Sequence, residues 1–298
     1  QILALPVMAK QHKRSFEDQV GRYLVNQGCF EVINNPFTDF EGKDAIAVDN
    51  PLDKQRAMLR TCLMNSIRTN IAYNQNRQKD SIKFFEFSDI YKTSGTERRF
   101  ALAVSGRVNK NAKEFNAQLD YGYLKGLINS ICTDIIKIQP TYELADKRGY
   151  DFYEALILNG SKIGGLGKIS KETIDSKVKT QVFACELTIG DLEVPDNCFV
   201  PISDFPASYR DLSFSLSDLE KVGTLTELVK ATTANQDLLT ESFIFDFFQN
   251  KKLNLLKIGF RFKFQAADKS LTDEEIDQIM DKVISDSMAL DGISIEGL

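Results

Sequence analysis

Histidine is almost absent from this sequence, since His12 is the single one in 298 residues. A Ser-His-Asp or Cys-His nucleophile system, or a metal site with several histidine ligands, would have to be built from that one residue. We therefore expect neither, and we interpret His12 as a surface residue near the start of a helix. Cysteine is also sparse, and the five thiols form no C-x-x-C pair. An odd number of scattered cysteines favours reduced thiols in a cytosolic protein over a disulfide framework or a zinc site.

Long apolar runs are missing as well, because no stretch approaches the roughly 20 residues that a membrane-spanning helix needs. The first residues, Gln1 to Pro6, contain no initiator methionine, no basic segment and no cleavage site, so they do not resemble a signal peptide. We expect an internal start, and hence a fragment of a longer protein. With 43% hydrophobic and 27% charged residues, the composition is that of a globular protein. The length suits about two domains.

Charge is unevenly distributed along the chain. The formal net charge of −5 argues against a general binder of polyanions. Residues 203–298 carry ten Lys or Arg and 17 Asp or Glu, whereas residues 1–202 have a net charge of +2. Between Phe247 and Ala267, however, no acidic residue occurs. Five bases lie there, namely Lys251, Lys252, Lys257, Arg261 and Lys263. Such a local basic patch on an acidic domain predicts a selective contact with an anionic ligand.

The first two thirds of the chain predict a domain of mixed helices and strands. Ser15 can cap a helix that carries Phe16, Val20 and Leu24 on one face and stops at Gly28. Further helices are expected over 58–74 and 121–136. Apolar runs predict strands at 29–34, 82–91, 100–108, 152–159, 161–169 and 181–187. A polar hairpin loop is expected over 92–99, and a tight turn at 159–160. Three prolines between 195 and 206 mark a domain boundary, which separates residues 1–200 from residues 203–298.

The last segment has the clearest pattern. Strands are predicted at 208–216, 239–248, 254–265 and 292–298. Helices are predicted to open at the capping sequences that begin with Thr224 and Thr272. The order β-α-β-β-α-β matches the ferredoxin-like motif, an antiparallel sheet with two helices on one face. Alternation over 254–265 indicates that the other face is open to solvent.

Alternation also assigns side chains to the two faces of that sheet. We expect Phe243, Phe245 and Phe247 to point toward the helices. The open face of this strand would then carry Thr240, Ser242, Ile244, Asp246 and Phe248, and the next strand would add Lys257, Arg261 and Lys263. These residues suit single-stranded RNA, because bases stack on an aromatic ring, cations meet phosphates and an acid accepts from a base edge. An ordinary solvated sheet face accounts for the same residues, and composition alone favours it.

Short motifs in the last domain resemble a known family. They are Phe205-Pro206, Arg210-Asp211, Phe245-Asp246-Phe247-Phe248 and Lys269-Ser270-Leu271-Thr272-Asp273-Glu274-Glu275, in that order. Together they resemble the ferredoxin-fold anticodon-binding domain that ends the β subunit of bacterial phenylalanyl-tRNA synthetase, with its F-P-x-x-x-R-D, F-D-x-Y and R-T-L-T-D-x-E. Phe248 stands where the family usually has tyrosine, so stacking is retained and a phenolic hydrogen bond is lost. Lys257 falls near a position that is often serine, and Glu296 stands where a closing arginine is expected.

Four upstream motifs resemble the class II synthetase-like domain of the same subunit. They lie at 28–32, at 50–63 (Asn50-Pro51-Leu52 followed by Leu59-Arg60-Thr61-Cys62-Leu63), at 85–91 and at 120–126. Active class II synthetases clamp ATP with an F-R-x-E strand and a later arginine in a glycine-rich motif. The corresponding strand here reads Phe84-Phe85-Glu86-Phe87, and the glycine-rich stretch 164–168 also lacks arginine and is better explained as a strand turn. Without both cations, which stabilise charge in phosphoryl chemistry, the domain is expected to be non-catalytic.

The resemblance implies a fold and a function for the chain. The fold is α+β, with a non-catalytic class II synthetase-like antiparallel sheet domain over 1–200 and a ferredoxin-like βαββαβ anticodon-binding domain over 203–298. The function is that of a carboxy-terminal part of the β subunit, which scaffolds the catalytic α subunit and binds tRNA(Phe). The holoenzyme would be a cytoplasmic (αβ)₂ heterotetramer that uses ATP and Mg²⁺, with neither bound by this fragment. The expected tRNA-binding residues are Arg210, Asp246, Phe248, Lys257, Arg261 and Lys263.

Alternatives stay open at three points. A free-standing synthetase paralogue, acting as an RNA-binding or assembly module without aminoacylation, would carry the same motifs. Arg210 and Asp211 could equally form a structural ion pair at the start of a strand. The apolar residues of the first helix could belong to the core or to a subunit interface.

Overall fold

The structure is a computed structural model that describes residues 15–40, 42, 44–109, 111–113, 116–190, 192–196, 199, 201–233, 236–250 and 255–295. The chain divides into two compact units, Gln1–Asn197 and Cys198–Leu298. His12, Lys251, Lys252 and Glu296, which the sequence analysis names, lie outside the described residues, as does Cys198, one of the five cysteines. Within the described ranges, no helix is both long and apolar enough to cross a membrane.

A seven-stranded sheet forms the centre of the first unit, in the order β1-β4-β5-β9-β8-β7-β6. Neighbouring strands run antiparallel, except that β1 pairs parallel with β4. The strands are β1 (Phe30–Glu31), β4 (Ser81–Lys92), β5 (Gly95–Gly106), β6 (Thr141–Leu144), β7 (Tyr150–Leu158), β8 (Ser161–Ile169) and β9 (Val182–Thr188). A separate short ladder joins β2 (Phe37–Thr38) to β3 (Met58–Leu59).

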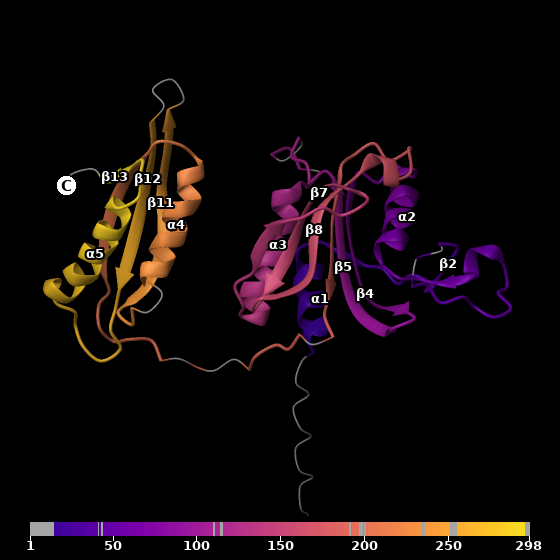
Figure 1. The fold of residues 1–298 in the computed structure, drawn as a ribbon, viewed down its shortest axis with the longest axis horizontal. Coiled ribbons are helices and arrows are strands. Elements are labelled where there is room, and N and C mark those ends of the chain that lie inside the picture. Colours follow the sequence, from indigo (N-terminus) through magenta and orange to yellow (C-terminus); the bar gives the residue numbers. More distant parts are fainter. Residues whose placement is uncertain are drawn as a thin grey trace, which may run out of the picture. The chain divides into compact units, whose positions relative to one another are not determined.

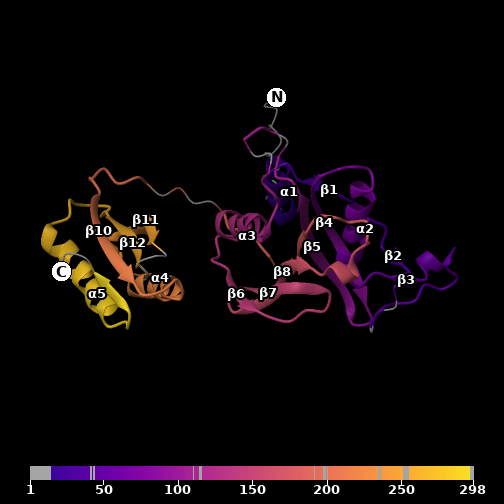
Figure 2. The same cartoon turned by 90° about the horizontal axis from the view of Figure 1, so that it is seen from above.

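Helices cover both faces of this sheet, as Figures 1 and 2 show. They are α1 (Phe16–Asn26), α2 (Met64–Gln75) and α3 (Tyr121–Ser130), which continues into a π-helical turn, Ile131–Ile136. Single 3₁₀ turns lie at Lys54–Arg56 and Lys171–Thr173. On one face, α1 and α3 share a buried cluster with Phe85 and Leu102 of the sheet. On the other face, α2 packs its isoleucines on small residues such as Ala101 and Ala103.

The predicted first helix is confirmed, and its stop at Gly28 agrees with the left-handed φ of 75° at that glycine. Ser15 accepts a hydrogen bond from the backbone amide of Asp18 at 3.2 Å, so it caps the helix as expected. The apolar residues Phe16, Val20 and Leu24 are buried in the core, which decides between the core and a subunit interface.

Two predictions about where elements of the first unit begin and end are wrong. The second helix starts at Met64 and not near 58, because Met58–Leu59 is extended and pairs with β2. The expected polar loop over 92–99 is instead a strand hairpin, in which β4 and β5 continue to a two-residue turn. Cross-strand charge pairs explain the longer ladder, since Lys92 meets Glu97 at 2.7 Å and Arg98 meets Asp89 at 3.4 Å.

The glycine-rich stretch 164–168 lies inside strand β8 and does not form the expected turn. A Cβ at Gly165 would stand 2.2 Å from the carbonyl oxygen of Glu154, and one at Gly167 would stand 2.1 Å from that of Phe152. Both oxygens belong to the neighbouring strand β7. Glycine is therefore required for close strand approach at these positions, which accounts for the pattern without a phosphate ligand.

The second unit is a four-stranded antiparallel sheet in the order β11-β12-β10-β13, with two helices on one face (Figures 1 and 2). Along the chain, the elements are β10 (Ser208–Leu216), α4 (Glu220–Thr233), β11 (Leu239–Asn250), β12 (Leu255–Phe264), α5 (Asp273–Met288) and β13 (Ile293–Ile295). This is the predicted βαββαβ order. The α+β fold class with a ferredoxin-like second domain is therefore confirmed.

The two helices of this unit differ in how well the sequence predicted their starts. The capping box of α5 is confirmed, because Thr272 and Glu275 exchange side-chain and backbone hydrogen bonds. The capping sequence at Thr224 predicts a start of α4 that is four residues too late. Helix α4 begins at Glu220, where Asp218 accepts a hydrogen bond from the backbone amide of Lys221 at 3.1 Å. An aspartate just before the first turn therefore supplies the cap.

Candidate nucleic-acid interface

Strand β12 separates the two faces of the second unit as the sequence predicts. Its apolar residues are buried toward the helices and belong to one core cluster; they are Leu256, Ile258, Phe260, Phe262 and Phe264. The alternate residues, Lys257, Gly259, Arg261 and Lys263, therefore face the uncovered side of the sheet. We call this side the open face.

Pairing with β12 places the residues of β11, because directly opposite residues of an antiparallel pair share a face. Asp246 lies opposite Gly259 and Phe248 lies opposite Lys257, so both are on the open face as expected. Phe243 lies opposite Arg261 and is therefore also on the open face. The prediction that Phe243 points toward the helices is wrong.

Two irregularities in the β11 ladder explain this error. The pairing shifts between Leu239 and Glu241 and again between Ile244 and Asp246. Each shift inserts one extra residue, and a single extra residue moves every following side chain to the other face. Ile244, expected on the open face, lies opposite the helix-facing Phe260 as a result. Alternation of side chains along the sequence does not reveal a β-bulge, so it assigns the wrong face to the residues between the two bulges.

Phe245, the extra residue of the second bulge, covers the open face with its ring. A Cβ added to Gly259 would stand 2.8 Å from the Cε1 atom of Phe245, so the ring lies directly over this glycine. The guanidinium carbon of Arg261 lies 4.7 Å from the ring centroid. The prediction that Phe245 faces the helices is therefore wrong, and its ring and Arg261 form a cation–π pair.

Asp211 of β10 holds Arg261 in this position. The Nε and Nη2 atoms of Arg261 donate to the two carboxylate oxygens of Asp211 at 2.8 and 2.7 Å. These hydrogen bonds lower the pKa of Asp211 and raise the pKa of Arg261. A two-pronged contact of this kind fixes the plane of the guanidinium, not only its charge. The open face thus presents a flat cation that is already oriented beside an aromatic ring.

Arg210 does not share this face. It lies opposite the helix-facing Phe262, and its guanidinium contacts Asp273 at 2.5 Å and Asp277 at 3.8 Å, both on α5. The alternative of an ion pair between Arg210 and Asp211 is wrong, since adjacent strand residues point to opposite faces. The ion pairs of Arg210 tie β10 to the first turns of α5.

The open face therefore brings together five of the six expected residues: Asp246, Phe248, Lys257, Arg261 and Lys263. Sequence reasoning missed Phe243, Phe245, Tyr209 and Glu241, and the last two lie opposite Lys263 on its two neighbouring strands. Phe243 is 39% exposed, Phe245 46% and Phe248 49%, so all three rings are accessible. Alternation with Asp211 would have found Tyr209, whereas no sequence signal marks the bulges that turn the two phenylalanines outward.

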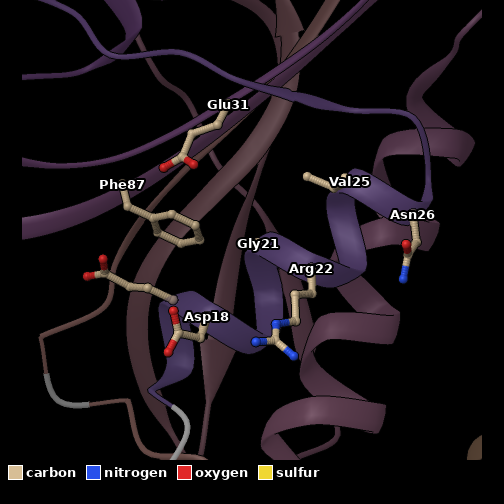
Figure 3. A pocket seen from close by; sticks show the side chains of 8 residues that line it. Asp18, Gly21, Arg22, Val25, Asn26, Glu31 and Phe87 are labelled. Atoms are coloured by element: carbon tan, nitrogen blue, oxygen red, sulfur yellow. The ribbon is translucent and has the colours of Figure 1, made fainter.

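A different groove lies in the first unit, between α1 and the strands β1 and β4 (Figure 3). It encloses about 520 Å³, and the ring of Phe87 reaches toward α1 at Gly21. Its lining includes the acids Glu17, Asp18 and Glu31. Glu17 is bound by Arg98 through two hydrogen bonds of 2.7 Å, which raise the pKa of Arg98. Arg22 also lines the groove, but three carboxylates beside a single guanidinium do not suit a phosphate-bearing ligand.

The sheet face under α2 includes the strand 84–87, which the sequence comparison with active synthetases makes the candidate for an ATP site, and this face does not fit that cofactor. Its candidate strand carries Glu86, which is buried and bound by Arg60 at 2.9 Å. Arg60 makes two further hydrogen bonds, from Nε to the carbonyl oxygen of Asp89 at 3.1 Å and from Nη2 to the hydroxyl of Ser88. Its donors are therefore used within the protein. Glu186 of β9 is also buried on this face, where it accepts a hydrogen bond from the backbone amide of Leu63 at 3.2 Å, and the isoleucines of α2 pack beside it. In the described parts of the chain, no three His, Cys, Asp or Glu side chains gather as metal ligands.

Family models match nearly the whole chain. The model described as phenylalanyl tRNA synthetase beta chain CLM domain matches residues 3–189, and the model described as ferredoxin-fold anticodon binding domain matches residues 203–290. The chain belongs to the phenylalanyl-tRNA synthetase β-chain family. The family expected from the motifs is therefore confirmed.

Similar curated proteins carry the name phenylalanine–tRNA ligase beta subunit. The protein from Mesoplasma florum is 26% identical over 300 residues, which cover 93% of this chain and 37% of the relative. The protein from Bacillus licheniformis is 23% identical and the one from Dehalococcoides mccartyi is 25% identical. The match with the Bacillus protein spans 89% of this chain and 36% of that relative. The match with the Dehalococcoides protein spans 88% of this chain and 34% of that relative. The chain thus spans about a third of the length of these relatives.

Proposed function

We propose that this chain is the carboxy-terminal part of a phenylalanine–tRNA ligase β subunit and that its second unit holds tRNA near the anticodon. The open face carries this proposal, since it joins accessible aromatic rings, an oriented arginine and two lysines on one surface. The family match to an anticodon-binding domain over residues 203–290 supports it. Residues 1–200 and 203–298 would be separate domains with separate tasks.

Each part of the open face has a role in this proposal. Unstacked bases of the anticodon loop stack on Phe248 and on the pair formed by Phe245 and Arg261, because every base offers a flat π-surface. Lys257 and Lys263 meet backbone phosphates. Asp246 accepts a hydrogen bond from a base edge, which gives the contact some sequence preference. Arg210 acts indirectly, by joining β10 to α5.

The first unit would scaffold the catalytic α subunit. It exposes apolar side chains along α1 and the segment that follows, with Val25 58%, Phe30 67% and Ile33 94% exposed. Val25 also lines the acidic groove of Figure 3, so this surface offers an apolar contact with a charged margin. The complete enzyme would be a cytoplasmic (αβ)₂ assembly that charges tRNA(Phe) with phenylalanine. ATP and Mg²⁺ would be bound by the α subunit and not by this chain.

The test combines Lys257→Glu with Phe248→Ala. Loss of one stacked base costs about 1–3 kcal/mol, so tRNA affinity should fall by roughly tenfold or more, while assembly with the α subunit is kept. The matched control, Lys282→Glu with Met288→Ala, makes the same charge change on exposed positions of α5, on the covered side of the sheet. Equal tRNA affinity of the two double variants at moderate salt would remove the open face from tRNA binding.

Co-purification separates this function from that of a free-standing paralogue. An α-type partner that binds this chain tightly and restores tRNA charging supports the ligase subunit. A chain that binds RNA but captures no such partner, and that does not support charging when an α subunit is supplied, supports the paralogue.

A further inference from the structure

A second groove with basic walls lies in the first unit, at the end of α2. It encloses about 580 Å³ and is lined by Gln75, Asn76, Gln78 and three lysines, Lys79, Lys177 and Lys179. All three lysines are exposed. They come from two segments that are far apart in the sequence, the turn after α2 and the loop before β9.

Basic residues outnumber acidic residues in these segments. Residues 54–79 contain six Lys or Arg and no Asp or Glu, and the loop over 170–181 contains three lysines and two acids, Glu172 and Asp175. The acid in the groove wall, Asp80, forms an ion pair with Arg107. The three lysines therefore make the electrostatic potential of the groove positive, although the chain as a whole has a net charge of −5.

Gln75 holds the two walls together. Its Oε1 accepts from the backbone amide of Lys179 at 3.2 Å. Its Nε2 donates to the hydroxyl of Ser105 at 3.0 Å and also to that of Thr180. The backbone amide of Lys79 in turn donates to the carbonyl oxygen of Asn74 at 3.1 Å. The backbones that carry the lysines are thus fixed by the fold, while the ammonium groups remain exposed.

An aromatic contact continues the groove along α2. Asn76 also lines a neighbouring cavity of about 390 Å³, whose wall includes Arg68 and Tyr73. Tyr73 is 56% exposed, and the guanidinium carbon of Arg77 lies 3.4 Å from its ring centroid. The surface thus combines several cations with side-chain amides, an exposed arginine–tyrosine stack and one exposed acid, Asp175, which accepts a hydrogen bond from the backbone amide of Lys177.

We propose that this groove binds the phosphodiester backbone of RNA, as a contact separate from the open face of the second unit. Lysines along a groove track phosphates, amides donate to phosphate and ribose oxygens, and an exposed ring with a stacked arginine accepts a base. An acidic protein segment would satisfy the lysines but would not use the stack. The proposal depends on the proposed function only in taking tRNA as the RNA.

The test is the triple variant Lys79→Gln, Lys177→Gln, Lys179→Gln in the full chain, with binding to labelled tRNA followed by fluorescence anisotropy over a range of salt concentrations. Each lost phosphate contact lowers the slope of log K against log salt by about 0.7–0.9. Loss of two or three contacts should therefore reduce the slope by about 2 and raise Kd by roughly tenfold or more near 0.1 M salt. The matched control, Lys113→Gln, Lys137→Gln, Lys162→Gln, removes three exposed lysines outside the groove lining.

The outcomes separate the two proposals. Equal Kd and slope for the groove variant and its control would overturn the RNA groove, whatever the open-face variant shows. A groove variant that keeps its tRNA affinity but no longer assembles with the α subunit would also overturn it and assign the groove to a protein partner. A reduced slope in the groove variant, with no effect of the open-face variant, would uphold the groove and reject the open face. Equal melting temperatures of groove and control variants exclude unfolding as the cause.

Discussion

The buried ion pair of Arg60 and Glu86 is predicted to make a large contribution to the stability of the first unit. The arginine side chain is 4% exposed and the glutamate side chain 2%, and Nη1 lies 2.9 Å from Oε1. The other carboxylate oxygen accepts from Nδ2 of Asn34 at 2.7 Å. The pair joins the segment after β3 to strand β4.

Arg60→Met should destabilise this unit strongly, because it leaves the Glu86 carboxylate buried without its cation. Breaking a buried pair from one side costs about 3–5 kcal/mol. For a unit of this size, each kcal/mol lowers Tm by about 2–4 °C, so a decrease of roughly 6–20 °C is expected. The double variant Arg60→Met, Glu86→Gln should recover part of this loss, since a neutral amide oxygen still accepts from Asn34 and no charge remains buried.

Calorimetry gives the size of the effect, and hydrogen exchange of the β4 and β5 amides assigns it to the first unit. Arg56→Met is the matched control, because it breaks an exposed pair with Asp53 at 3.6 Å and should cost less than about 1 kcal/mol. Two results would refute the reasoning. One is an Arg60→Met variant no less stable than Arg56→Met, and the other is a double variant that loses the sum of its two single changes.

Three further changes test the second unit and the buried thiols. Gly259→Ala should weaken tRNA binding several-fold, because the new Cβ would stand 2.8 Å from the Phe245 ring and displace it. Adding Phe245→Ala to this variant should weaken binding little further, since both changes act on the same ring. An unchanged Kd for Gly259→Ala would contradict the role of this ring. Arg210→Met should cost less than about 1 kcal/mol in unfolding free energy and leave the salt slope of tRNA binding unchanged. Burial raises the pKa of Cys29 to about 11 and of Cys132 to about 12 from 9.0. Above pH 9 the thiols ionise in the unfolded chain but stay neutral in the folded protein, so the free energy of unfolding falls as pH rises toward 11 and 12. The fall is at most about 1.4 kcal/mol per thiol and pH unit. Replacing both cysteines with alanine should therefore make the free energy of unfolding less dependent on pH between 9 and 12.

Much of the architecture followed from local sequence. The cap at Ser15, the capping box at Thr272 and the apolar periodicity of both helices act within a few residues, so they place α1 and α5 without tertiary information. The alternation in β12 assigned its two faces for the same reason. Four cysteines of the described residues, Cys29, Cys62, Cys132 and Cys185, have free thiols.

Features that depend on distant partners were not predictable in this way. The bulges of β11 are visible only in its pairing with β12, and they turned Phe243 and Phe245 onto the open face. The start of α2 depended on Met58–Leu59 pairing with β2. The hydrogen bonds between Asp211 and Arg261, and those of Gln75 in the basic groove, each join segments that are far apart in the sequence.

The sequence by itself therefore determined the family, the fold class and most of the candidate residues of the open face, because motifs and periodicity are local properties of the chain. Only the tertiary structure decided which of those residues share a surface. It placed Arg261 with Phe245 and Asp211, removed Arg210 to the helix side and gathered three lysines at the end of α2. The physical reason is that strand register and groove walls are set by contacts between segments, which no local pattern records.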